Sequence, residues 1–137
     1  MGKILLIDDD EGFARAFCNN VREYYPLLNV ETCANPLAAL ALLKKENIDL
    51  LLIDLEMPML DGGKVMSYAT GAGIDKNRIV ILSGRDADYL HARFPMGTCL
   101  AVLNKYEAKQ KVVLDMIFSS LQKKQVAAAD NRPAAVG

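Results

Sequence analysis

The chain has 137 residues, with 16 basic and 17 acidic side chains and a formal net charge of −1. This length supports one domain with a single hydrophobic core. The near balance of charges gives no basic surface for nucleic acid or an anionic membrane, so we expect no direct nucleic-acid binding.

Cysteine usage and the N-terminal residues indicate where the protein works. The three cysteines are far apart and form no Cys-x-x-Cys pair, which fits a reducing cytoplasm. The apolar run at residues 4–7 is too short for a signal peptide or a membrane span. We therefore expect a soluble cytoplasmic protein.

Short apolar runs alternate along the chain with longer stretches of helical period, a pattern typical of parallel strands joined by crossover helices. The runs at residues 4–7 and 50–53 are apolar throughout, as expected for central strands covered on both faces. The predicted strands are residues 3–7, 28–33, 48–53, 78–82 and 99–103.

The helical stretches between these strands carry local start signals. Asn35 precedes a proline at the first helical position, and Asp10 and Glu11 place negative charge at the start of the first helix. After Gln125 the residues are small, with neither a strand pattern nor a helix stop, so residues 1–124 form the predicted domain and 125–137 a flexible tail or truncated linker. The predicted helices are residues 12–25, 36–46, 64–71, 86–93 and 107–124.

Polar side chains stand where the apolar strands end, the edge at which open parallel sheets bind ligands. Asp8, Asp9 and Asp54 would bring three negative charges together over an apolar core. Such a cluster requires a cation, and Mg²⁺, which Mn²⁺ could replace, prefers oxygen ligands of this kind. Taken alone, residues 8–11 also fit a turn and a helix start, and a serine or lysine after a strand is ordinarily a turn or solvated residue.

Four segments together resemble the receiver domains of response regulators in two-component signal transduction, in particular chemotaxis-regulator-like ones. They are Ile-Leu-Leu-Ile-Asp-Asp-Asp-Glu, Leu-Leu-Ile-Asp-Leu-Glu-Met-Pro-Met-Leu-Asp-Gly, Ile-Val-Ile-Leu-Ser-Gly and Val-Leu-Asn-Lys. The resemblance extends from residue 3 to about residue 122. It implies an α/β, flavodoxin-like, doubly wound sheet of five parallel strands in the order 2-1-3-4-5, with five helices.

The resemblance also implies a phosphoacceptor switch. A histidine kinase or phosphotransfer protein would donate the phosphoryl group, and the domain would be a signalling module that catalyses only its own phosphorylation and hydrolysis. The implied roles are phosphoacceptor for Asp54, metal binding for Asp8, Asp9, Asp54 and the main-chain carbonyl of Glu56, and contacts to phosphoryl oxygens for Ser83 and Lys105.

The chain departs from the family pattern at three positions. Tyr106 follows Lys105 where a proline is usual, so a cis peptide there is not expected. Val102 replaces the switching aromatic residue, and Gly84 follows Ser83 where a larger small residue is commoner. These changes predict intact chemistry with an altered conformational relay.

Glu56 and Arg85 occupy positions that flank access to the phosphoryl group in the family. Opposite charges there could shield an acyl phosphate from water, whereas the simpler alternative is that both are solvated. Pro58, Asp61 and Gly62 are expected only to shape the loop after Asp54, and His91 to be a surface residue.

Two other functions are compatible with part of this pattern. A haloacid-dehalogenase-like phosphatase also uses an aspartate nucleophile and magnesium, but it needs an aspartate where this chain has Glu56. A pseudo-receiver would be an interaction module that is never phosphorylated, and only the altered relay residues favour it.

The last predicted helix carries more apolar surface than one side of a sheet can cover. Its apolar residues span roughly 240° of the helical wheel, and packing on a sheet needs a stripe only somewhat wider than ~100°. We therefore expect a homodimer or target contact on the face made by the fourth helix, fifth strand and fifth helix. The apolar residues are Val112, Val113, Leu114, Met116, Ile117, Phe118 and Leu121.

Overall fold

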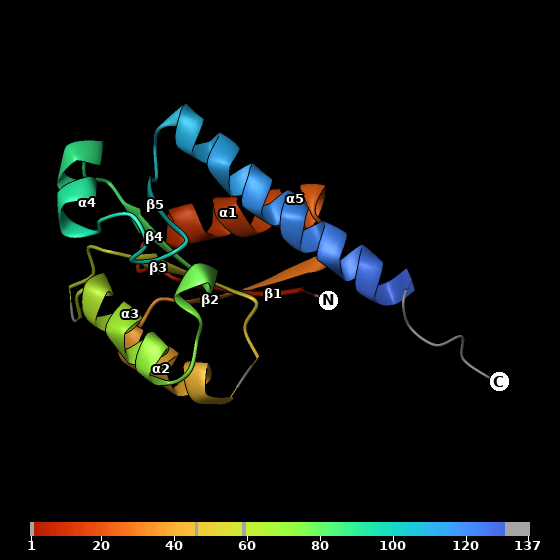
Figure 1. The fold of residues 1–137 in the computed structure, drawn as a ribbon, viewed down its shortest axis with the longest axis horizontal. Coiled ribbons are helices and arrows are strands. Elements are labelled where there is room, and N and C mark those ends of the chain that lie inside the picture. Colours follow the sequence, from red (N-terminus) through yellow and green to blue (C-terminus); the bar gives the residue numbers. More distant parts are fainter. Residues whose placement is uncertain (1, 46, 59, 131–137) are drawn as a thin grey trace.

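The computed structural model describes residues 2–45, 47–58 and 60–130. Strands and helices alternate along the chain (Figure 1). Their bounds are β1 Gly2–Ile7, α1 Glu11–Tyr24, β2 Leu28–Cys33, α2 Pro36–Lys45, β3 Leu50–Asp54, α3 Gly62–Gly71, η1 Lys76–Arg78, β4 Ile79–Ser83, α4 Ala87–Arg93, β5 Ala101–Asn104 and α5 Ala108–Asp130.

The five strands form one parallel sheet in the order β2-β1-β3-β4-β5, which confirms the predicted fold class and strand order. β3 and β4 are buried along their whole length, including Asp54 and Ser83 at their ends, and the burial of residues 50–53 agrees with the prediction from that apolar run. Successive side chains of a strand point to opposite faces, so each central strand contributes to two cores.

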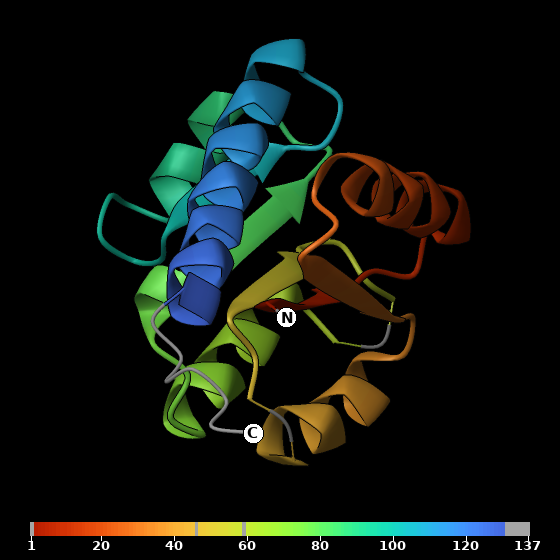
Figure 2. The ribbon, with the colours of Figure 1, turned by 90° about the vertical axis from the view of Figure 1, so that its right-hand side faces the viewer.

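Helices cover both faces of the sheet. Figures 1 and 2 show α1 and α5 on one face and α2 and α3 on the other. The first core contains Ile4 and Leu6 of β1 with apolar residues of α1 and α5. The second core contains Leu5 and Ile7 with residues of α2, α3 and α4. Within the described residues, no helix has both the length and the apolarity to cross a membrane.

Aspartate and asparagine side chains begin most of the helices. The Oδ1 atom of Asp10 accepts a hydrogen bond from the amide of Phe13 at 3.0 Å, and Asp86 does the same for Tyr89 at 2.9 Å. Asn35 accepts from the amide of Leu37 at 2.9 Å, as the Asn-Pro pair predicts. Each cap satisfies an amide that has no partner within its own helix.

Most boundaries lie within two residues of the prediction, among them β3, which begins at residue 50 rather than 48, and α3, which begins at residue 62 rather than 64. α5 continues to Asp130, six residues past the expected end at residue 124, because the sequence from Val126 to Ala129 favours helix and contains no stop signal. β5 begins at residue 101 rather than 99, since the amide of Leu100 donates to the carbonyls of Lys76 and Ile79 just before the strand. Glu46, the predicted last residue of the second helix, and residues 131–137 of the predicted tail lie outside the described residues.

Candidate functional site

The carboxyl edge of the sheet brings the predicted polar residues together. Asp54 and Ser83 are the last residues of β3 and β4, and Asp8 and Lys105 follow β1 and β5. Main-chain hydrogen bonds fix these positions: the amide of Asp8 donates to Cys33 at 3.1 Å, and that of Lys105 donates to Ser83 at 2.9 Å. The parallel register therefore places four strand ends around one site.

Three carboxylates form the acidic part of this site. Asp8, Asp9 and Asp54 each offer an oxygen atom, and these atoms lie within 4.8 Å of one another. Asp8 and Asp54 are only 2% and 4% exposed, whereas Asp9 is exposed. The site therefore has two buried carboxylates and one that faces solvent.

Lys105 supplies the positive charge. Its Nζ atom lies 2.6 Å from Oδ2 of Asp8, 3.5 Å from Oδ2 of Asp54 and 4.6 Å from the centre of the Phe13 ring. Burial alone would lower the pKa of Lys105, but the hydrogen bond and charge of Asp8, together with the charge of Asp54, outweigh it and raise that pKa. Lys105 is therefore a buried ammonium held by two carboxylates.

The single ammonium of Lys105 does not neutralise the negative charge of all three carboxylates. Burial and the negative charge of Asp8 raise the pKa of Asp54 from 3.8 to about 7, against the opposing charge of Lys105 and the hydrogen bond from the amide of Glu56. The ionised form of Asp54 is thus disfavoured in the isolated chain. A divalent cation at this position would favour it.

The donor set fits magnesium. Every side-chain ligand in the cluster is a carboxylate oxygen, the donor type that Mg²⁺ prefers. The Oδ2 atom of Asp8 is fully buried and is held by the ammonium of Lys105 at 2.6 Å. The exposure of Asp9 leaves one side open to water, and Mg²⁺ in proteins usually keeps several water ligands.

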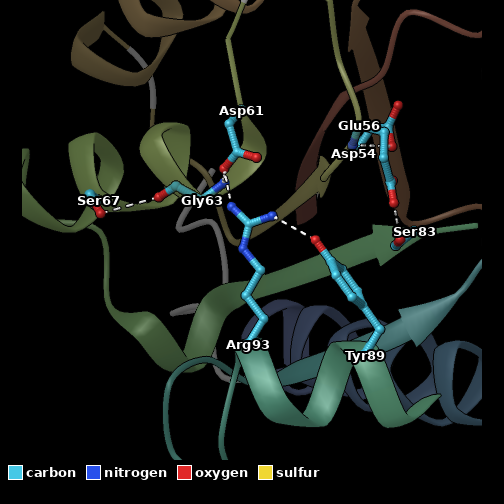
Figure 3. Close-up of polar contacts among 8 residues, drawn as sticks. All are labelled: Asp54, Glu56, Asp61, Gly63, Ser67, Ser83, Tyr89 and Arg93. Carbon is cyan, nitrogen blue, oxygen red and sulfur yellow. Dashed lines mark hydrogen bonds and ion pairs between the residues drawn. The ribbon is translucent and has the colours of Figure 1, made fainter. Parts of the chain in front are cut away.

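Ser83 stands beside the cluster and is fully buried. Its hydroxyl donates to the Oε1 atom of Glu56 in a close contact (Figure 3). The same hydroxyl accepts from the amide of Arg85 at 3.0 Å. The amide of Glu56 donates to Oδ1 of Asp54 at 3.2 Å. The guanidinium of Arg85 lies 4.0 Å from the ring centre of Tyr89. Glu56 thus contacts both Asp54 and Ser83.

A network between α3 and α4 was missed from the sequence. Arg93 forms an ion pair with Oδ1 of Asp61 at 2.5 Å and donates to the hydroxyl of Tyr89 at 3.3 Å (Figure 3). Asp61 also caps α3 by accepting from the amide of Gly63 at 2.8 Å. Burial opposes ionisation of Asp61, but the hydrogen bonds from Arg93 and Gly63 outweigh it and lower its pKa. The aspartate before the helix signals the cap, whereas nothing in the local sequence signals the ion pair.

Gly62 is required by a close approach of the main chain. A Cβ atom at this position would lie 2.5 Å from the carbonyl oxygen of Asp54 and 2.8 Å from Cα of Leu55. The amide of Gly62 donates to the carbonyl of Leu55 at 3.1 Å. The absence of a side chain therefore lets α3 begin directly against the end of β3.

The position of Tyr106 agrees with the expected departure from the family pattern. The described part of the chain contains no cis peptide bond, and the bond between Lys105 and Tyr106 is trans. Asn104 organises this turn: its side chain accepts from the amide of Tyr106 at 2.8 Å and donates to the carbonyl of Arg85 at 3.0 Å. Asn104 thus joins the segments that follow β4 and β5.

Sequence comparison identifies the family to which this fold belongs. Residues 4–118 match the response regulator receiver domain, so the chain belongs to that family. Among curated proteins the search found no match.

Solved receiver domains share the fold at low sequence identity. The receiver domain of the Francisella response regulator 1452 is 23% identical with a TM-score of 0.73, covering 91% of this chain and 99% of its own. Response regulator TrrA from Thermotoga maritima, in complex with Mg²⁺-BeF, is 20% identical with a TM-score of 0.73, covering 88% and 99%. A CheY-like receiver domain protein from Methanospirillum hungatei is 20% identical with a TM-score of 0.72, covering 91% and 98%.

Proposed function

We propose that this protein is a signalling switch in which Asp54 accepts a phosphoryl group in a magnesium-dependent reaction. The observation that carries the proposal is the buried group of Asp8, Asp54 and Lys105 with the fully buried Ser83 beside it. An oxygen of the Asp54 carboxylate forms a bond to phosphorus. The bond between phosphorus and the donor breaks, and its electron pair leaves with the donor.

Each neighbouring group has a part in this reaction. Asp8, Asp9, Asp54 and the main-chain carbonyl of Glu56 would hold Mg²⁺, which would supply positive charge that neutralises the phosphoryl oxygens. Lys105, already held at the site by both carboxylates, neutralises a second phosphoryl oxygen. Ser83 donates a hydrogen bond to a third. Mn²⁺ can take the place of magnesium, since it accepts the same oxygen ligands.

The experiment is to incubate the protein with acetyl phosphate or phosphoramidate and Mg²⁺ and to measure its intact mass. We expect the increment of one phosphoryl group, its loss in EDTA and its absence in Asp54→Asn, because an amide is a poor nucleophile and a poor ligand. Labelling of Asp54→Asn to the same extent as the wild type would refute the assignment. No labelling of the wild type would favour a pseudo-receiver that acts only by binding.

The phosphoryl donor in the cell would be a histidine kinase or phosphotransfer protein. TrrA, which has this fold, was solved in complex with Mg²⁺-BeF, and another similar structure is the receiver domain of the hybrid histidine kinase CckA. We place the protein in the cytoplasm, where the free Cys18, Cys33 and Cys99 stay reduced. We propose no catalytic activity beyond phosphorylation and hydrolysis of its own aspartate.

Glu56 and Arg85 border the mouth of the site, together with Asp9 and Tyr106. We propose that they modulate access of water to the acyl phosphate. The Arg85→Ala substitution, which removes the guanidinium group, should then shorten the lifetime of the phosphorylated protein. An unchanged half-life for hydrolysis would exclude this role for Arg85.

The face formed by α4, β5 and α5 is the proposed contact surface for a second copy or a target. Val112 and Met116 are 58% and 68% exposed, so part of the apolar surface of α5 is uncovered. Phe118, one of the apolar residues expected to contribute to this surface, is instead buried against Phe17 and Tyr25. Sedimentation of wild type and Met116→Glu, each with and without beryllofluoride, tests the proposal, and a wild type that stays monomeric in both states would exclude the dimer.

A further inference from the structure

The hydroxyl of Ser83 is already engaged before any phosphoryl group arrives. Its one hydrogen atom is directed to Oε1 of Glu56, and its oxygen accepts the hydrogen bond from the amide of Arg85 at 3.0 Å. A serine hydroxyl has a single hydrogen to donate. Ser83 therefore cannot donate to Glu56 and to a phosphoryl oxygen at the same time.

From this conflict we infer that Glu56 is a positioning residue that holds Ser83 in the unphosphorylated state and must release it for phosphoryl transfer. The inference rests on the proposed function, because it assigns Ser83 to a phosphoryl oxygen. In the unphosphorylated protein, the carboxylate of Glu56 accepts the Ser83 hydrogen bond that a phosphoryl oxygen accepts after phosphorylation. Phosphorylation of Asp54 exchanges one negatively charged acceptor of the Ser83 hydrogen bond for another.

The surroundings of Glu56 suit such an exchange. The main chain of Glu56 is fixed next to Asp54, because the amide of Glu56 donates to Oδ1 of Asp54 at 3.2 Å. Its side chain is exposed and lies at the mouth of the site, with Arg85 among the residues that line the same hollow. Figure 3 shows the carboxylate of Glu56 extending from the end of β3 to Ser83 on β4. The carboxylate can therefore turn into solvent without any movement of the strands.

The first test is the rate of phosphorylation by phosphoramidate with Mg²⁺, followed by intact mass. Glu56→Ala should be phosphorylated about tenfold faster than the wild type, the effect expected when a hydrogen bond to a charged group no longer has to be broken. Glu56→Gln separates the hydrogen bond from the charge, because its amide oxygen still accepts from Ser83. We expect its rate to lie between those of the wild type and Glu56→Ala, whereas a pure charge effect would make the two variants equal.

A double-mutant cycle with Ser83→Ala decides whether Glu56 acts through Ser83. In the Ser83→Ala background the hydroxyl is absent, so Glu56→Ala should no longer accelerate the reaction. Equal acceleration in both backgrounds would overturn the inference, because Glu56 would then act on the donor directly. No acceleration in either background would overturn it as well.

A charge control and a second readout complete the experiment. Glu11→Gln removes one negative charge at the start of α1, and Glu11 forms no described contact with Ser83, so its rate should stay within about twofold of the wild type by the usual size of a screened surface charge. Beryllofluoride affinity should follow the same order as the rates. If no variant shows labelling that depends on Asp54, the proposed function fails and the role of Glu56 fails with it. If the wild type is labelled and the cycle shows no coupling, only the role of Glu56 fails.

Discussion

Asp54 should destabilise the folded chain when magnesium is absent. Burial and the charge of Asp8 raise the pKa of Asp54 from 3.8 to about 7. At ~1.36 kcal/mol per pKa unit, the ionised carboxylate can destabilise the folded state by at most about 4 kcal/mol above pH 7. Screening and relaxation around the site reduce the effect, so we expect Asp54→Asn to gain about 1–2 kcal/mol in EDTA at pH 8. The folded state binds the proton more tightly than the unfolded chain. The stabilisation from the protonated carboxyl is therefore complete below pH 3.8 and is lost as the pH rises through about 7.

Urea unfolding in EDTA at pH 5 and pH 8 measures this difference. The stability advantage of Asp54→Asn over the wild type should be small at pH 5 and reach its full size at pH 8. Addition of about 10 mM Mg²⁺, an excess over a weak site, should stabilise the wild type but not Asp54→Asn. Asp9→Asn makes the same chemical change at an exposed member of the cluster and should give a smaller gain. An Asp54→Asn protein that is no more stable than the wild type at pH 8, or whose advantage does not change with pH, would refute the reasoning.

Four further substitutions test the surroundings of the site by urea unfolding. Gly62→Ala should cost about 2–3 kcal/mol, since its Cβ would lie 2.5 Å from the carbonyl oxygen of Asp54; an effect below about 0.5 kcal/mol would show that α3 shifts freely. Asp61→Ala should cost about 1–2 kcal/mol through the lost cap and ion pair, against about 0.5 kcal/mol for Arg93→Ala, which removes the exposed ion pair and the contact with Tyr89 but leaves the cap. Because its pKa is lowered, the contribution of Asp61 should be lost as the pH falls through that pKa, and equal costs at pH 7 would exclude the capping role. In EDTA, Lys105→Ala should lose about 2–3 kcal/mol by leaving buried carboxylates unpaired, and Mg²⁺ should restore more stability than it adds to the wild type. Equal magnesium stabilisation of both proteins would contradict this balance.

Most of the fold could be predicted because burial leaves a direct trace in the sequence. Strands covered on both faces need apolar residues throughout, and residues 50–53 have them. Short polar side chains mark the starts of helices, as Asn35 does for α2. The end of α5 was not predicted, because alanine-rich sequence continues a helix as readily as it frays, and local sequence does not decide between the two.

The positions of the site residues could be predicted, but not all of their contacts. The ends of parallel strands meet at one edge, so Asp8, Asp54 and Ser83 were expected together. The contact of Ser83 with Glu56 joins residues 27 positions apart, and that of Arg93 with Asp61 joins residues 32 positions apart. Such contacts depend on side-chain rotamers and on the spacing of elements in three dimensions, which a single sequence does not specify.

The strand order also determines when a growing chain can begin to fold. Among the strands of this sheet β1 is synthesised first, yet it lies between β2 and β3. At 5–20 residues per second, roughly 1–4 s separate the synthesis of Cys33, which completes β2, from that of Asp54, which completes β3. Until β3 is made, the main-chain N–H and C=O groups on one edge of β1 lack the strand with which they pair in the sheet, and an unpaired strand edge is a template for aggregation. Rapid formation of α1, which packs on Ile4 and Leu6, would cover one face of the strand while the chain waits for β3.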